Sequence, residues 1–344
     1  MVNSSVVSSM EVGSLDVFHL KRLWSKVMLN RAGLLQDQAH VDEWVLDKIV
    51  IFGLGLALEE TFQYLYQAAP TFGEFERWIL AKNGGAINQQ QIERINAAIA
   101  GTIHRESSQE AQLVEFSEPA LSEEDLSFWE ENGYVVVHGA VSKESCKVAE
   151  EAIWEFLAMS PDEPETWYQR ASDHGIMVQF FQHQALQANR RSPRIHKAFA
   201  QLWGTAELWT TVDRVSFNPP ERPGWRFPGP RLHWDTSLDL PIPFGVQGLL
   251  YLTDTVATQG AFTCVPGFHR RIADWLKSLP PDADPRQADL EGLGPVPIAG
   301  EAGDLIIWHQ ALPHGSSPNT ARRPRIVQYV YMYPADEEHR KDWK

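Results

Sequence analysis

The sequence predicts an α+β protein, in which an N-terminal helical segment precedes a jelly-roll-like barrel of short strands. Up to residue 101, apolar residues recur at helical spacings of three and four. After Pro193, short β-rich runs follow one another, separated by Pro and Gly. Helical patterns do not alternate with these runs, which disfavours a doubly wound parallel sheet.

The bulk composition is that of a folded globular protein with an acidic charge. Apolar residues make up 43%, charged residues 22%, and the formal charge is -15. Because this charge repels phosphate backbones and anionic membrane surfaces, we expect no nucleic-acid and no membrane partner. The longest apolar run, 49–58, is too short to cross a bilayer and predicts a buried helix.

Two cysteines, Cys146 and Cys264, lie far apart and lack a CxxC partner. They support neither a disulfide framework nor a cysteine-rich zinc cluster, and they favour a reducing compartment. The N-terminal residues lack the basic start and the cleavage site of a secretory signal. We therefore expect a cytoplasmic location.

The N-terminal segment, residues 15–101, predicts helix after helix. The residues Asn83-Gly84-Gly85 are expected to end one helix, and residues 89–99 to form the next. Residues 105–120 are polar and weakly periodic, typical of a linker or of a covering segment. We therefore divide the chain into a helical extension, 1–115, and a second domain, 116–344.

The second domain is expected to begin with helices. Ser122 and Asp125 resemble a capping box that opens a helix through residue 131, which Gly133 ends before a strand at 134–137. A second helix is predicted over 142–159. Its apolar side would carry Val148, Ile153, Phe156 and Leu157.

Five later runs predict short strands, because they are rich in β-branched and aromatic residues and are bounded by Pro or Gly. Many short strands indicate a sandwich or a barrel, and the absence of alternating helices favours a jelly-roll-like barrel. The runs are 209–217, 246–252, 261–265, 304–308 and 326–333.

The first chemical motif is His233-Trp234-Asp235. In an extended strand, His233 and Asp235 point to the same face and Trp234 to the other. One imidazole and one carboxylate can take two vertices of a facial metal site, which a second imidazole would complete. The triplet by itself is equally consistent with a structural histidine or a surface pair.

Two further motifs follow it along the chain. Residues 303–319 read GDLIIWHQALPHGSSPN and are followed by Arg325, eleven residues beyond His314, and residues 260–270 read GAFTCVPGFHR. Together the three motifs resemble the phytanoyl-CoA dioxygenase family over roughly residues 120–335. The first hundred or so residues lie outside the resemblance. Phe268 departs from the family, which usually has serine there, at a position outside the metal site.

The resemblance implies a double-stranded β-helix, the cupin-like form of a jelly roll, with Fe(II) held by His233, Asp235 and His314. It also implies 2-oxoglutarate as cosubstrate and O2 as oxidant, with succinate and CO2 as coproducts. Arg325 would bind the distal carboxylate of 2-oxoglutarate through paired hydrogen bonds. Ser316 matches a position expected to help hold the cosubstrate, although a turn serine bonding its own backbone is the alternative.

Asp235 also bears on the reaction. Related halogenases have a small residue at this position, so the carboxylate favours hydroxylation over chlorination. Desaturation, epimerisation and ring formation use the same ligands and stay open. A small or medium-sized organic metabolite is the expected substrate, and a carrier-bound or CoA-bound substrate is an alternative.

Several nearby residues are weaker candidates. His309 is expected at a strand end and His269 in a structural or loop-closing role, while Arg322 and Arg323 should be solvated in a turn. His174 and His183 are interpreted as surface or satisfied histidines. The loop 218–230 could form a lid or a plain connection, and Gln179 and Gln182 could line a pocket or a solvated strand face.

A competing class of function is a cupin-like metal-binding protein or isomerase without oxygen chemistry. Arg325 favours the oxygenase, since a protein that needs no 2-oxo acid has no use for an arginine there. The helical extension is expected to pack on the barrel. Its alternatives are contact with a carrier protein or formation of a homodimer.

Overall fold

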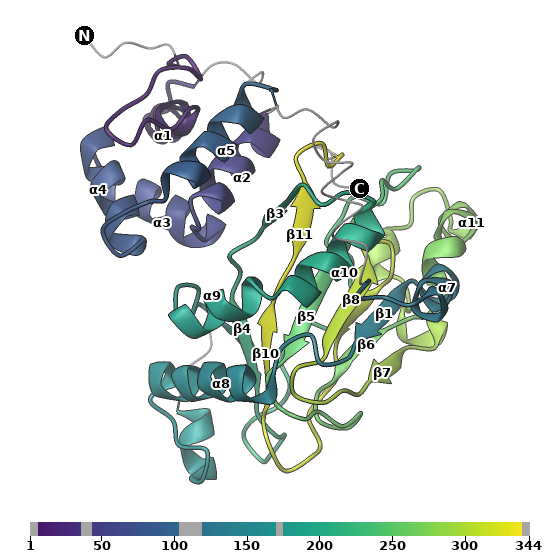
Figure 1. Cartoon of the computed structure of the whole chain (residues 1–344). Coiled ribbons are helices and arrows are strands. Elements are labelled where there is room, and N and C mark those ends of the chain that lie inside the picture. The colour runs from purple at the N-terminus through teal and green to yellow at the C-terminus, as the bar shows by residue number, and fades with distance from the viewer. Residues whose placement is uncertain (1–5, 36–42, 103–118, 170–174, 339–344) are drawn as a thin grey trace. The chain divides into compact units, whose positions relative to one another are not determined.

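The computed structural model describes residues 6–35, 43–102, 119–169 and 175–338, and the chain divides into two compact units (Figure 1). The first unit holds the described residues of Met1–Val114 together with Glu207–Val212 and Pro334–Glu337. The second holds those of Glu115–Ala206, Asp213–Tyr333 and Glu338–Lys344. The predicted linker lies almost entirely outside the described residues, so the domain division near residue 115 stays a proposal.

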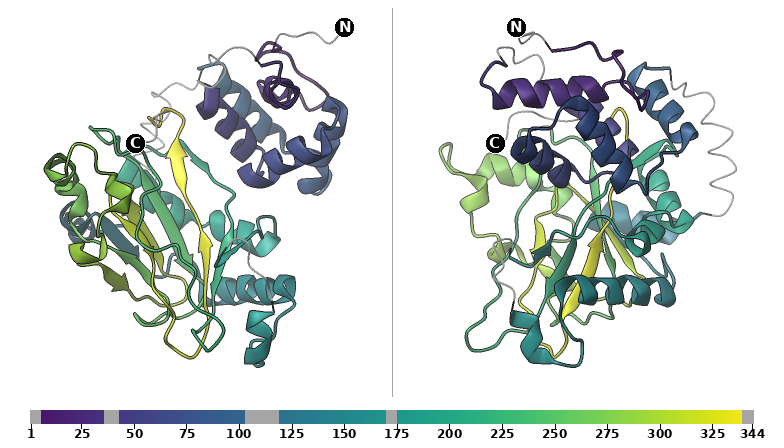
Figure 2. Two further views of the ribbon diagram at one scale, coloured as in Figure 1. Left: turned by 180° about the vertical axis from the view of Figure 1, so that it is seen from behind. Right: turned by 90° about the vertical axis from the view of Figure 1, so that its left-hand side faces the viewer.

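The N-terminal residues of the first unit are helical, as the apolar spacing predicts, and the helices pack against one another (Figure 2). Thr71 and Glu74 form a capping box at the start of one helix, which ends at Lys82, where the Asn-Gly-Gly stop was predicted. The predicted buried helix over the apolar run 49–58 is confirmed only in part, because the helix ends at Gly53 and residues 54–57, which are mostly buried, lie outside it. The helices are α1 Leu20–Arg31, α2 Trp44–Gly53, α3 Leu58–Ala68, α4 Phe72–Lys82 and α5 Gln89–Ile99. No helix among the described residues has both the length and the apolar character needed to span a membrane.

The second unit begins as predicted. The side chains of Ser122 and Asp125 cap each other's backbone at the start of a helix, and Gly133 ends that helix in a left-handed conformation (φ 74°). The helices of this unit are α7 Glu123–Asn132, α8 Lys143–Leu157, α9 Gln184–Arg190, α10 Pro193–Trp203 and α11 Ile272–Ser278.

The predicted buried side of α8 is wrong in part. Ile153 is buried, but Val148 and Phe156 are about half exposed. The helix instead turns the small residues Cys146 and Ala149 inward, and the Cys146 thiol lies 3.7 Å from the carbonyl oxygen of Tyr251. Cys146 and Ala149, whose small side chains allow this close approach, share the buried side with Ile153 and Trp154.

The strands form antiparallel sheets, which confirms the α+β class. The larger sheet has the order β1-β8-β5-β10-β4-β2, and a smaller one has the order β7-β6-β9. The strands of the larger sheet are β1 Tyr134–Val137, β2 Met177–Val178, β4 Val215–Asn218, β5 Val246–Tyr251, β8 Leu305–His309 and β10 Arg325–Tyr329. Those of the smaller sheet are β6 Phe262–Cys264, β7 Val296–Ile298 and β9 His314–Ser316.

Two of the predicted strands are each divided. The run 209–217 becomes β3, Leu208–Thr210, and β4, which belong to different sheets, and the Asp213 carbonyl between them accepts a hydrogen bond from the Arg190 side chain (2.8 Å). The run 326–333 becomes β10 and β11, Met332–Pro334.

The core of the second unit lies between its two sheets. Leu249, Ile306 and Val327 of the larger sheet belong to the same buried cluster as Phe262 of the smaller one. The Tyr251 hydroxyl joins them, since it donates to the Ile298 carbonyl (2.7 Å) and accepts from the Phe262 amide (3.0 Å). Both cysteines are buried and free.

Candidate metal centre

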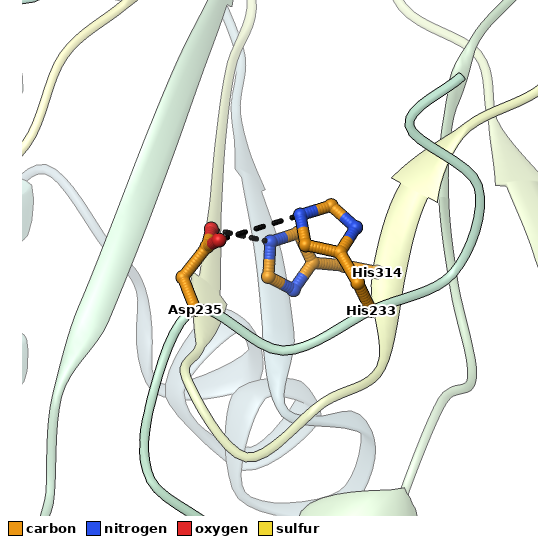
Figure 3. A group of neighbouring side chains, drawn as sticks. All are labelled: His233, Asp235 and His314. Atoms are coloured by element: carbon orange, nitrogen blue, oxygen red, sulfur yellow. Dashed lines mark hydrogen bonds and ion pairs between the residues drawn. The ribbon is translucent and has the colours of Figure 1, made fainter. Parts of the chain in front are cut away.

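His233, Asp235 and His314 come together in the second unit (Figure 3). One nitrogen or oxygen atom of each side chain lies within 4.8 Å of those of the other two. His233 Nε2 is 3.4 Å from Asp235 Oδ1, and His314 Nε2 is 3.3 Å from Asp235 Oδ2. In the part of the chain that the structure describes, this is the single group of three or more His, Cys, Asp or Glu side chains with such spacing.

The backbone around His233 is a bridge and not the predicted strand. His233 exchanges two backbone hydrogen bonds with His314 (2.9 and 3.0 Å), and the residues on either side join no sheet. The predicted orientation nevertheless holds. Trp234 is buried in the core, and its indole N–H donates to the Ala311 carbonyl (3.0 Å), so His233 and Asp235 lie together on the other side.

Both imidazole rings are held through Nδ1. His233 Nδ1 lies 2.7 Å from the Arg231 carbonyl oxygen, and His314 Nδ1 lies 3.0 Å from that of Leu312. Because a carbonyl only accepts, each Nδ1 carries a proton that it donates. Each Nε2 therefore faces the Asp235 carboxylate and needs either a second proton or a cation in between, and this tautomer is the one that metal-ligating histidines adopt.

The three groups also shift one another's protonation. Partial desolvation by the surrounding protein would raise the pKa of Asp235, but hydrogen bonds from His233 and His314 outweigh it and lower that pKa well below its ordinary value. Burial would lower the pKa of His233, but the hydrogen bond and charge of Asp235 raise it. Asp235 is therefore an anion at neutral pH, which suits a metal ligand.

Gln247 is a neighbour of the cluster that the sequence analysis missed. Its Nε2 donates to Asp235 Oδ2 (2.9 Å), and its Oε1 accepts from the indole N–H of Trp308 (3.0 Å). The one available signal was a polar residue within an otherwise apolar strand, β5.

A cavity of about 290 Å³ opens beside the cluster. The predicted residues Arg325 and Ser316 line it together with the cluster. Its other lining residues include Met177, Leu249, Phe262, Trp308, Tyr329 and Tyr331, which the sequence analysis did not select. Gln179 and Gln182 are not among the residues that line it, and the strand predicted around them is reduced to β2.

Arg325 is a buried cation that has no anionic partner among the described residues. Only 1% of its surface is exposed. One guanidinium nitrogen, Nη2, donates to the Ser216 hydroxyl (2.9 Å), whereas Nε is buried without a hydrogen-bond partner. Among the described residues, no carboxylate lies within ion-pair distance of Arg325. Since burying an uncompensated charge is costly, a carboxylate ligand in the cavity would complete this site.

The rival arginines and Ser316 also have clear positions. Arg322 and Arg323 are exposed in the turn before β10, as predicted. Ser316 lies in β9, where its N–H donates to the Pro230 carbonyl (3.1 Å), and not in a turn. The alternative of a turn serine that bonds its own backbone is therefore disfavoured.

The weaker histidine candidates lie outside the cluster. His309 ends β8 as predicted, and its Nδ1 accepts from the Ala311 amide (3.0 Å). His269 Nε2 lies 3.2 Å from the Glu130 carbonyl oxygen, consistent with a loop-closing role. His183 caps α9 by accepting from the Ala185 amide (3.3 Å), and His174 lies outside the described residues.

Phe268, which stands where the family usually has serine, is a core residue. It is 1% exposed, and its ring lies 5.4 Å from that of Trp275 and 6.1 Å from that of Trp234, measured between ring centroids. Phe268 therefore packs near Trp234, the residue between His233 and Asp235 in the sequence.

Comparison with known proteins agrees with the resemblance that the motifs indicate. The model of the phytanoyl-CoA dioxygenase (PhyH) family matches residues 129–327. A Dictyostelium discoideum protein named "Putative phytanoyl-CoA dioxygenase" is 22% identical over 274 residues, which cover 62% of this chain and 78% of that protein. "Dioxygenase lolE1" of Epichloe uncinata is 23% identical over 255 residues, which cover 65% of this chain and 88% of that protein.

Two solved structures are among those similar to this chain. One is the non-haem α-ketoglutarate-dependent epimerase SnoN from nogalamycin biosynthesis, with 18% identity, a TM-score of 0.47 and coverage of 64% of this chain and 85% of that one. The other is EctD from S. alaskensis with bound Fe, with 17% identity, a TM-score of 0.47 and coverage of 65% and 81%.

Proposed function

Because the chain belongs to the phytanoyl-CoA dioxygenase family, we propose that it is a non-haem Fe(II)- and 2-oxoglutarate-dependent oxygenase that hydroxylates a small or medium-sized organic molecule. One observation carries the proposal: a single cavity brings together a His-Asp-His cluster and a buried arginine without an anion. The first feature suits a metal ion and the second a carboxylate. A 2-oxo acid that binds a metal at one end and presents a carboxylate at the other satisfies both.

His233, Asp235 and His314 would hold the iron. Two imidazoles and one carboxylate form the facial ligand set of non-haem Fe(II) oxygenases, which leaves the other coordination positions open. When bound, Fe(II) together with 2-oxoglutarate and O2 supplies the oxidising chemistry, with succinate and CO2 as coproducts. We also propose that the two antiparallel sheets, which share one core, are those of a double-stranded β-helix.

Arg325 would bind the distal carboxylate of 2-oxoglutarate. Its planar guanidinium can make paired hydrogen bonds, and its unpartnered Nε is one donor available for them. Ser316, in the wall of the same cavity, would add a hydroxyl donor. These groups would neutralise the ligand's charge, and the burial of Arg325 would limit the access of water to that contact.

Asp235 supports hydroxylation over chlorination, since related halogenases lack a carboxylate at this position. Arg325 argues against a cupin-like protein without oxygen chemistry. Such a protein would have to leave the buried guanidinium without an anionic partner, at a cost in stability.

The direct test compares two histidines of the same segment, one inside the cluster and one outside it. His314→Ala should abolish Fe(II) binding and Fe(II)-dependent formation of succinate from 2-oxoglutarate, both measured on the purified full chain. His309→Asn keeps an acceptor for the Ala311 amide and should leave both unchanged. Full iron-dependent turnover by His314→Ala would show the ligand assignment to be wrong, and a wild-type protein that forms no succinate would overturn the oxygenase.

A further inference from the structure

The three side chains of the cluster differ in how they are held. The rings of His233 and His314 are fixed through Nδ1 by backbone carbonyls and share a backbone bridge. Asp235 lies in a bend beyond that bridge, and its side chain is 49% exposed. The orientation of its carboxylate therefore depends on whichever side chains contact it.

Besides the two histidines, Gln247 provides such a contact, through a 2.9 Å hydrogen bond from Nε2 to Asp235 Oδ2. A glutamine amide can point either end toward a neighbour, so the bond needs something that sets its direction. Trp308 supplies it. An indole N–H can only donate, and it lies 3.0 Å from Gln247 Oε1, so the NH2 group must face the carboxylate.

Gln247 and Trp308 are held in place by the sheet. Gln247 and Trp308 are directly paired in the register of β5 and β8, in the middle of the larger sheet. The Trp308 side chain is almost fully buried, and its ring lies 4.5 Å from that of Phe262, centroid to centroid. Through Trp308 and Gln247, the sheet thus orients the Asp235 carboxylate, which lies on a separate, bent segment.

We propose that Gln247, oriented by Trp308, is a positioning residue for the metal ligand Asp235. It occupies one carboxylate oxygen, so that Asp235 binds the metal through the other and leaves further coordination positions free for cosubstrate. This inference rests on the proposed function, because it assumes that the cluster binds a metal. Partners that orient ligands in this way typically change metal affinity by roughly 10- to 100-fold when they are removed.

The test measures binding of the metal alone, with Co(II) as the probe, on the full chain. Gln247→Leu removes the donor and should weaken Co(II) binding by roughly 10-fold or more. It should also alter the visible absorption of bound Co(II), which reports its coordination. Gln247→Glu places a second carboxylate against Asp235 and should change the absorption as well. Trp308→Phe keeps an aromatic ring but loses the indole N–H, and should weaken binding to a smaller extent.

The matched control is Gln310→Leu. Gln310 is a glutamine of the same unit whose amide donates to the Pro243 carbonyl, outside the cavity, so its loss should leave Co(II) affinity and absorption unchanged. A Gln247→Leu variant with wild-type affinity and absorption would overturn the positioning role and leave the oxygenase standing. If that variant does not fold, an unaltered Trp308→Phe decides against the role in the same way. A wild-type chain that binds no metal would overturn the proposed function, and the positioning role with it.

Discussion

His233 and His314 are joined by two backbone hydrogen bonds, from the His233 N–H to the His314 carbonyl (2.9 Å) and back (3.0 Å), outside any sheet that contains them both. Each Nδ1 also donates to a further backbone carbonyl, so both rings are held by hydrogen bonds to the backbone. The position of Asp235, the third member of the cluster, depends instead on side chains from other segments. These side chains are therefore the most informative sites for mutation.

Arg286 holds the backbone on both sides of Asp235. Its guanidinium donates to the carbonyls of Trp234 (2.8 Å) and Thr236 (2.6 Å). Arg286→Gln should therefore lower the free energy of unfolding by roughly 2 kcal/mol, since charge-assisted hydrogen bonds are lost. Urea unfolding measures this loss. Arg322→Gln, at an exposed position in a turn, is the control and should stay within about 0.5 kcal/mol of wild type. An equal free energy of unfolding for the two variants would contradict the prediction.

Arg325→Lys keeps the positive charge but loses the planar pair of donors. We expect 2-oxoglutarate binding to the Mn(II)-loaded protein to weaken by about 2 kcal/mol, or roughly 30-fold, as measured by calorimetric titration. Arg323→Lys changes an exposed arginine two residues away and should bind normally. Unchanged affinity in Arg325→Lys would mean that the cosubstrate carboxylate lies elsewhere.

Phe268→Ser restores the residue usual in the family, yet it should destabilise this chain. The ring is fully buried against Trp234 and Trp275, so its removal leaves a cavity and buries a hydroxyl, at a cost of about 4 kcal/mol. Phe268→Leu retains most of the volume and should cost much less. Thermal and urea unfolding of the two variants check the order, and a neutral Phe268→Ser would show that the site repacks freely.

His309 should make stability depend on pH. Burial, together with the nearby His269, lowers the pKa of His309 to about 4 from an ordinary value near 6.5. At neutral pH the residue is uncharged in both folded and unfolded chains. As pH falls below about 6.5, the unfolded chain takes up the proton first, so the folded state loses stability until about pH 4.

The expected loss of unfolding free energy through His309 between pH 7.5 and pH 5 is about 2 kcal/mol. His309→Asn cannot take up this proton but keeps an acceptor for the Ala311 amide. Urea unfolding at the two pH values should therefore show a smaller decrease for the variant than for wild type. Equal decreases would assign the pH dependence to other groups.

The sequence by itself determined the features that depend on neighbouring residues or on ordered motifs. Three such features are local, because their hydrogen bonds join residues only a few positions apart in the sequence. They are the capping box of Ser122 and Asp125, the stop at Gly133 and the helix over 89–99. The motif spacing also selected His233, Asp235, His314 and Arg325, which the structure brings to one cavity.

Tertiary structure alone decided what depends on segments far apart in the chain. Trp308 reaches Gln247 because β5 pairs with β8, and Arg190 of α9 donates to the Asp213 carbonyl between the two halves of the run 209–217. The inward side of α8 carries Cys146, which contacts the Tyr251 carbonyl of β5, far away in the sequence. Each of these features depends on a contact with a residue far away in the chain. The spacing of residues in the sequence does not specify that contact, because only the folded structure brings the two residues together.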